Sequence, residues 1–123
     1  MKRSIFSIGI FLVGCAAEPI AVTPVALSPE QTSAITDGVK RALKDPESAQ
    51  LANLRAARSD KTGTIRVCGT VNAKNSYGGY NGHMPFFGHL VVNDPPIFQV
   101  AQIASPQKNS DILINAQCRY AGL

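Results

Sequence analysis

A single apolar run, Ile5–Val13, sets the first limit on what this chain can fold into. It follows Lys2 and Arg3, and a charged start before a short apolar stretch is typical of a secretory signal peptide. The run is far shorter than the roughly 20 residues that span a bilayer. We therefore expect residues 1–14 to be removed, which leaves 15–123 for one domain with one hydrophobic core.

The composition favours a folded domain over a disordered chain. Hydrophobic residues make up 45% of the sequence and charged residues 16%, whereas a disordered chain is poorer in the first and richer in the second. The formal net charge of +4 includes Lys2 and Arg3, which leave with the leader. The charge that remains is weak evidence for nucleic-acid binding, and we expect no nucleic-acid partner.

The end of the leader carries a more specific motif, Leu12-Val13-Gly14-Cys15. It resembles the lipobox of bacterial lipoproteins at all four positions. The resemblance implies that a diacylglycerol is attached to the Cys15 thiol, that the chain is cut before this residue, and that the new amino group is acylated. Several acyl chains are needed because one chain anchors only marginally, at about 0.8 kcal/mol per buried CH₂. The alternative is an ordinary secretory leader with an incidental cysteine.

The residues after Cys15 indicate where the protein is held. In enterobacterial lipoproteins an Asp directly after the lipidated Cys retains the protein at the inner membrane, and this chain has Ala16 there. The resemblance therefore implies a lipid anchor in the outer membrane and a domain that faces the periplasm. Prolines recur in the following segment, so we expect residues 15–27 to form an extended tether and 28–123 to form the domain.

A helix is predicted directly after the tether. Ser28-Pro29-Glu30-Gln31 is a capping-box sequence, with Ser at the N-cap, Pro at the first helical position and Gln at N3. The helix is expected to end at Asp45, because the residue before Pro46 is pushed out of the helical region.

The rest of the chain reads mostly as strands of alternating apolar and polar residues. The predicted strands are 51–58, 64–73, 86–92, 97–104 and 111–119. The fold class expected is α+β, with one N-terminal helix packed on a small antiparallel sheet of four to five strands.

Once Cys15 carries lipid, Cys68 and Cys118 remain as a pair in an oxidising compartment. The natural interpretation is a disulfide between them. Strand alternation points Cys68 away from the apolar face of its own strand, and we expect a β-bulge at Gly69 to redirect its side chain.

Two alternatives use the same cysteines. A redox pair normally has a Cys-x-x-Cys motif, which this chain lacks. Cys68 and Cys118 with His83 and His89 give the ligand count of a zinc site, but their spacing matches no usual zinc framework. We therefore expect no metal and no cofactor.

Two further stretches resemble small uncharacterised exported bacterial proteins. These are Lys44–Ala49 and the Cys-Gly-x-Val-Asn-x-Lys-Asn stretch that begins at Cys68, followed by Gly78-Gly79-Tyr80. The resemblance marks a domain and implies no activity or binding site.

The segment between Asn75 and His83 is the best candidate binding loop. Tyr77, Tyr80 and His83 offer flat rings with polar tips, and glycines allow a tight reversal. Such a loop is suited to stacking on a sugar ring or on a partner's surface. The alternative is a structural loop whose tyrosines cover the edge of the core.

Basic residues gather along one part of the sequence and offer a second surface for contact. They are Lys40, Arg41, Lys44, Arg55, Arg58, Lys61 and Arg66. They suit anionic lipid headgroups near the anchor, or else they form an ordinary solvated face.

No nucleophile motif or pair of carboxylates points to catalysis, so we expect no catalytic residue. The expected function is a noncatalytic binding or envelope-structural role, accessory to an envelope or secretion assembly, with an envelope protein as a further partner. An inhibitor or small-ligand or glycan binder that uses the Tyr77–His83 loop is the first alternative. A cell-wall or lipid hydrolase is the second.

Overall fold

The computed structural model describes Gly14 and residues 20–106 and 109–123, so the predicted lipidation at Cys15 lies outside the described residues. The helices and strands follow one another along the chain as β1 Val22–Val25, α1 Pro29–Arg41, a short 3-10 helix Pro46–Ser48, β2 Gln50–Ser59, β3 Ile65–Asn72, β4 Met84–Val91, β5 Ile97–Ile103 and α2 Ser110–Tyr120.

The start of α1 is the predicted capping box. The Ser28 hydroxyl accepts a hydrogen bond from the Gln31 backbone at 3.2 Å, and the Gln31 side chain accepts one from the Ser28 backbone at 3.0 Å. Two of the amides that a helix start leaves unpaired are satisfied in this way. The α-helix ends at Arg41, and Asp45 then caps the short 3-10 helix that begins at Pro46.

All five strands form one antiparallel sheet in the order β1-β2-β3-β4-β5, so each strand pairs with its neighbours in sequence. The α+β class is confirmed. The predicted position of the helix is wrong, because β1 precedes α1 and pairs with the far end of β2. Pro24 lies in this edge strand, where a missing amide donor is tolerated. The sheet thus extends into the segment predicted to be tether.

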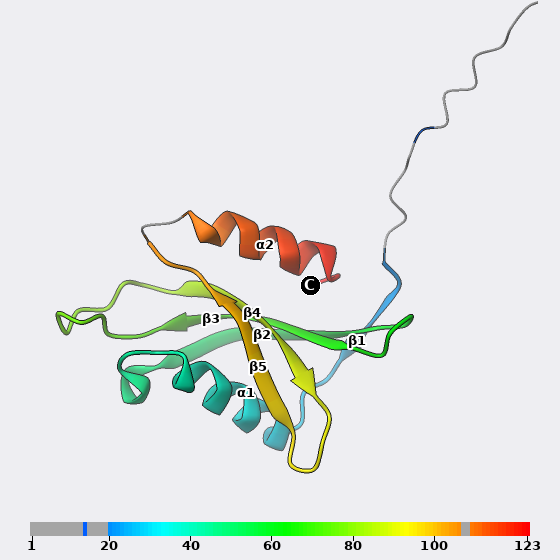
Figure 1. The fold of residues 1–123 in the computed structure, drawn as a ribbon, viewed down its shortest axis with the longest axis horizontal. Coiled ribbons are helices and arrows are strands. Elements are labelled where there is room, and N and C mark those ends of the chain that lie inside the picture. Colours follow the sequence, from blue (N-terminus) through cyan, green and yellow to red (C-terminus); the bar gives the residue numbers. More distant parts are fainter. Residues whose placement is uncertain (1–13, 15–19, 107–108) are drawn as a thin grey trace, which may run out of the picture.

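The two helices lie on opposite sides of the sheet (Figure 1). Side chains of β3 alternate accordingly, and Val67 and Val71 belong to the main core under α1, whereas Cys68 belongs to a smaller cluster under α2. The residues buried in the main core are Ile35, Val39, Ala56, Ile65, Val67, Val71, Phe86, Leu90 and Phe98.

The strand predicted over 111–119 is wrong, because these residues form α2. Ile114 and Cys118 are four residues apart, which places them on one side of a helix, and both are buried at 0% and 4% exposure. Ile112 shares the predicted strand face with Ile114 but is 65% exposed. Within the described residues, no helix has the length and apolar character needed to cross a membrane.

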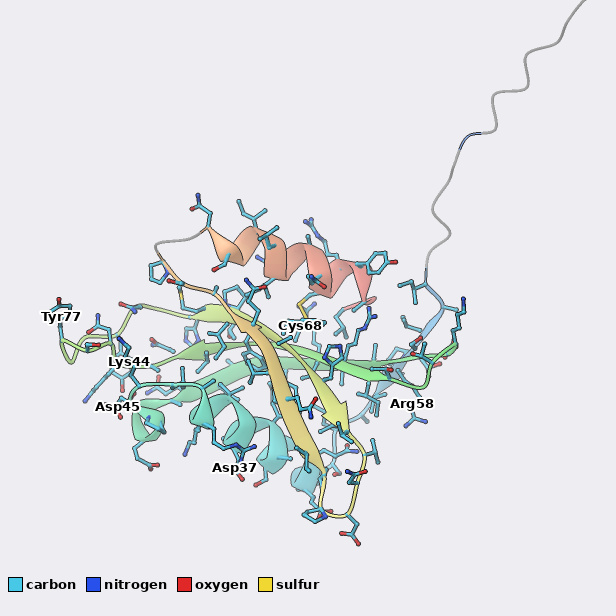
Figure 2. The ribbon with its side chains drawn as sticks, in the orientation of Figure 1. Asp37, Lys44, Asp45, Arg58, Cys68 and Tyr77 are labelled. Atoms are coloured by element: carbon cyan, nitrogen blue, oxygen red, sulfur yellow. A yellow bond between two sulfur atoms is a disulfide. The ribbon has the colours of Figure 1, made fainter. Side chains whose placement is uncertain are left out.

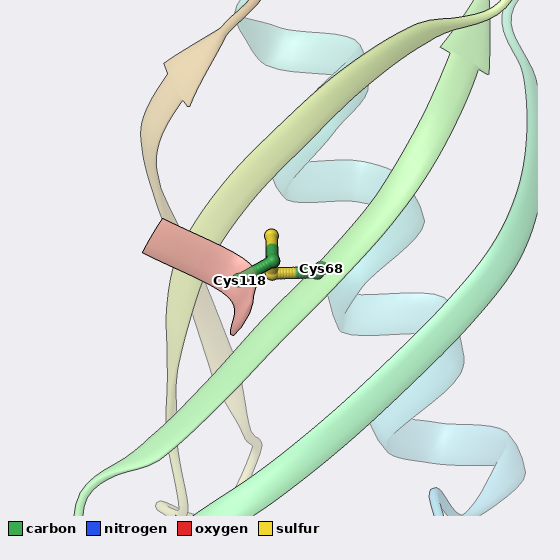
Figure 3. Close-up of a disulfide and its surroundings, with 2 residues drawn as sticks. All are labelled: Cys68 and Cys118. Carbon is green, nitrogen blue, oxygen red and sulfur yellow. A yellow bond between two sulfur atoms is a disulfide. The ribbon is translucent and has the colours of Figure 1, made fainter. Parts of the chain in front are cut away.

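The disulfide between Cys68 and Cys118 is confirmed. It joins β3 to α2 with a Cα–Cα distance of 6.1 Å (Figure 3). The irregularity at Gly69 lies in the neighbouring strand: β3 itself pairs with β4 in continuous register from Ile65 to Val71, and the bulge is in β2, where Asn53 and Leu54 lie opposite Gly69. No redirection of Cys68 is needed, because α2 lies over the face to which this side chain already points.

Candidate functional site

A cleft of about 490 Å³ opens where three segments meet: the end of α1, the loop between β3 and β4, and the end of β5. Its lining residues are Ala42, Leu43, Lys44, Val71, Ala73, Lys74, Asn75, Ser76, Tyr77, Asn81, Gly82, Met84, Ile103, Ala104, Ser105 and Pro106. Apolar side chains from the sheet and helix supply one part of this lining, and amides, hydroxyls and two lysines supply the other. This mixture is typical of ligand sites.

Asn75 holds the loop that forms one wall of the cleft. Its side-chain oxygen accepts hydrogen bonds from the Tyr77 and Gly79 backbones at 2.9 and 3.2 Å. Its side-chain amide donates to Asn81 at 3.0 Å. Gly78, at φ +79°, provides the positive-φ reversal that follows Tyr77. The backbone of the loop is therefore held by hydrogen bonds to the side chain of Asn75.

The three predicted binding-loop residues occupy different environments. Tyr77 lies at the loop tip (Figure 2), where it is 98% exposed, and it is among the residues that line the cleft. Tyr80 is 47% exposed and lies beside Lys74, whose ammonium is 5.9 Å from the centre of the tyrosine ring. His83 is exposed on the strand side of the loop. Of these three described residues, only Tyr77 contributes to the cleft wall.

Two lysines give the cleft a positive charge. Lys44, just beyond α1, donates a hydrogen bond to the Ser76 hydroxyl at 3.0 Å, and this bond ties the helix end to the loop. Lys74 is positioned through its backbone amide, which donates to Ser48 at 2.9 Å. No carboxylate is among the described residues that line the cleft. The site is therefore suited to a ligand that carries negative charge.

The seven basic residues that cluster in the sequence do not form one surface. Lys44 and Arg58 lie at opposite ends of the sheet (Figure 2). Between β2 and β3, Arg55 lies opposite Cys68 and Arg66 lies opposite Ala57. Arg55 also lines a depression beside α2. A single lipid-binding patch made of all seven is therefore not formed.

The arrangement needed for the alternative zinc site is not present. Both cysteines are oxidised in the disulfide, and His89 packs edge-on against the Phe87 ring at 5.2 Å between centroids. Over 20–106 and 109–123, no three His, Cys, Asp or Glu side chains are placed to share a metal ion.

Sequence reasoning missed most of the cleft. Leu43 falls within the predicted helix and Ile103 within the strand predicted over 97–104, and nothing in the sequence marks either residue as part of a site. Nothing local in the sequence links the end of α1 to the end of β5, because their proximity follows from the packing of α1 across the sheet. Lys44 was identified only as one of several basic residues, and its bond to Ser76 spans 32 positions.

Comparison with known proteins gives no match, whether with family models, with curated proteins or with solved structures. The site is therefore interpreted from its own geometry.

Proposed function

We propose that this protein is a lipid-anchored lipoprotein of the bacterial outer membrane, with the lipid on Cys15 and a noncatalytic binding domain in the periplasm. The leader and the Leu12-Val13-Gly14-Cys15 motif support the anchor. The disulfide suits an oxidising compartment. The cleft between the end of α1, the loop 73–83 and the end of β5 is the proposed binding site.

The observation that carries the binding role is the joint placement of Lys44, Lys74 and Tyr77 around one cleft. An exposed tyrosine ring offers a flat surface on which a sugar ring can stack. The two ammonium groups attract a carboxylate or phosphate, and the amides of Asn75 and Asn81 offer hydrogen bonds to hydroxyls. We infer that the ligand class is a small acidic sugar or an acidic part of a glycan.

The binding site is tested by NMR titration of the ¹⁵N-labelled protein with glucuronate and glucose 6-phosphate, with glucose as the neutral control. We expect amide shifts at Lys44 and Asn75–Asn81, and little change with glucose. Tyr77→Ala and Lys44→Ala should each weaken binding at least about fivefold, which corresponds to about 1 kcal/mol. Lys61→Ala is the matched control, since this exposed lysine lies outside the cleft. Equal shifts with glucose, or shifts only outside the cleft, would contradict the proposal.

The anchor is tested separately by labelling cells with radioactive palmitate. The native chain should incorporate the label, and Cys15→Ser should abolish incorporation. Mass spectrometry should show a mature chain that begins at Cys15. Recovery of an unprocessed chain that retains Met1 would refute the anchor and leave the cleft proposal standing.

A hydrolase is the second candidate, because Ser76 and Lys44 lie within hydrogen-bond distance in the cleft. A serine beside a lysine is also the arrangement of Ser–Lys hydrolases. Activation of such a pair depends on desolvation, and both side chains are exposed here, which favours binding over catalysis. A fluorophosphonate probe should therefore leave the protein unlabelled. Labelling that is lost in Ser76→Ala would favour the hydrolase.

A further inference from the structure

The outer side of α2 is apolar. Ile114 and Cys118 face the sheet and are buried, and at 3.6 residues per turn the opposite arc of the helix carries a separate set of side chains. The exposed apolar residues on this arc are Ile112, Leu113, Ala116 and Tyr120. The three large ones are 65%, 61% and 63% exposed in that order. A surface helix normally turns polar residues outward, so this face is a candidate contact surface.

Cations border the same face. Arg119 on α2 and Arg55 on β2 line one shallow depression of about 430 Å³, together with Ile112. No Asp or Glu side chain is among the described residues around this depression, which Leu123 also lines. The acid of α2, Asp111, lies in the first turn, at the other end of the helix from Arg119. Two guanidinium groups beside exposed apolar side chains suit a surface that combines phosphates with hydrocarbon.

The chain enters the domain beside the end of this helix. Gly122 follows α2 and packs so closely against Val22, the first residue of β1, that a Cβ at Gly122 would overlap the Val22 side chain. Cys15 precedes Val22 by seven residues. At no more than about 3.6 Å per residue, this stretch spans at most about 25 Å. A lipid on Cys15 therefore keeps the end of α2 within reach of the bilayer surface.

We propose that the outer face of α2 docks on the membrane surface, an inference that rests on the lipid anchor proposed above. Ile112, Leu113 and Tyr120 enter the boundary between headgroups and acyl chains, as the apolar side of an interfacial helix does. Arg55 and Arg119 contact the lipid phosphates. The anchor supplies attachment, and α2 fixes which side of the domain faces the bilayer.

A second copy of the chain fits this surface less well than a membrane does. A stable interface buries roughly 800 Å² per partner from about 20–30 residues a side, whereas this face offers three large apolar side chains, each already more than a third buried. Pairing two α2 helices would also bring the guanidinium groups of both copies to one interface.

The test uses the absence of tryptophan from the sequence. Ile112→Trp introduces one fluorophore on the proposed docking face, and Tyr77→Trp introduces one at the exposed loop tip as the matched control. Each full-length protein is reconstituted in vesicles of phosphatidylethanolamine and phosphatidylglycerol that contain brominated acyl chains. We expect bromine to quench the Ile112→Trp protein at least threefold more than the Tyr77→Trp protein. Adding Leu113→Ser and Tyr120→Ser should bring the quenching down towards the control.

Failure of the docking and failure of the anchor give different results. If mass spectrometry finds the lipid but bromine quenches both tryptophan proteins equally, the docking is refuted and the anchor stands. If the lipid is missing but added vesicles still quench the Ile112→Trp protein selectively, the docking is supported and the anchor is refuted. A doubled mass on sedimentation, with blue-shifted emission and no selective quenching, would assign the face to a second copy and overturn the proposal.

Discussion

At Gly38 the backbone of α1 lies directly against β5. A Cβ placed on Gly38 would be 2.7 Å from the carbonyl oxygen of Phe98 and 2.9 Å from its ring atom Cδ1. Helix propensity alone predicts that Gly38→Ala stabilises α1 by about 1 kcal/mol. We expect the opposite, a loss of about 1–3 kcal/mol in the free energy of unfolding measured in urea, because the new methyl group meets a strand carbonyl. Ser33→Ala, at an exposed position of the same helix, should be neutral or slightly stabilising. A more stable Gly38→Ala protein would contradict the close approach.

Asn75 is the residue on which the order of the cleft loop depends. Asn75→Ala removes the two bonds that its oxygen accepts and the one that its amide donates to Asn81. In an exposed loop we expect a loss of only about 1 kcal/mol in global stability. The local effect should be larger, with backbone amide exchange at Gly79 at least tenfold faster by NMR. Asn81→Ala removes one of the three bonds and should have a smaller effect, and unchanged exchange at Gly79 in Asn75→Ala would show that the backbone alone orders the loop.

Single residues of the site could be identified from sequence only where their own chemistry distinguished them. Tyr77 was predicted together with Tyr80 and His83, because rings next to glycines are typical of a binding loop. Tyr80 has the same neighbours but pairs across the loop with Lys74, and local sequence does not separate the two. The lysines and apolar residues of the cleft depend on contacts between distant segments, which no local pattern reports.

Among the elements, α1 and β2–β5 were predictable because each carries its own pattern or cap. The capping box defined the start of α1 to the residue. α2 was missed because Ile112, Ile114, Ala116 and Cys118 alternate as a strand would, although Ile114 and Cys118 also fit one helical face. Because apolar residues also lie on the exposed side of α2, the sequence does not distinguish the alternation of a strand from the apolar face of a helix. β1 was missed because Pro24 argues against a strand unless the strand lies at an edge.

The disulfide ties α2 to β3 beside a small buried cluster that includes Ile114 and Phe87. Few α2 side chains are buried beside it, and it closes a sequence separation of 50 residues. Replacing both Cys68 and Cys118 by Ala should lower the free energy of unfolding by about 4 kcal/mol in the chain-entropy description. Hydrogen exchange should show that α2 amides lose protection before those of β3. Cys15→Ser is the control, since it leaves the pair intact and should not change stability. Equal protection of α2 and β3 in the double variant would show that packing alone holds the helix.

At the scale of the molecule, the chain enters at one end of the sheet and the cleft opens at the other. Val22 pairs with Ser59 at the first end, and Leu51 pairs with Val71, a cleft residue, at the second. The eight residue-to-residue steps along β2 from Leu51 to Ser59 span roughly 25 Å. No described residue of α2 lines the cleft, although Ser105, which does, donates its backbone amide to the Ser110 hydroxyl at the start of α2 at 2.8 Å. It is the point of attachment that lies at the far end of the sheet from the cleft, and we therefore expect an anchored protein to keep its cleft open to solvent.

Because the cleft and the docking face use different residues, two tyrosine variants should each affect only one of the two measurements. Tyr77→Ala should weaken glucuronate binding at least about fivefold and leave bromolipid quenching of the Ile112→Trp protein unchanged. Tyr120→Ala should lower that quenching by about half, because an aromatic ring leaves the docking face. It should change the glucuronate Kd by less than about twofold, since substitutions at well-separated sites act independently. If Tyr77→Ala also reduced the quenching, the loop itself would contact the bilayer, and the cleft would open towards the membrane rather than away from the point of attachment.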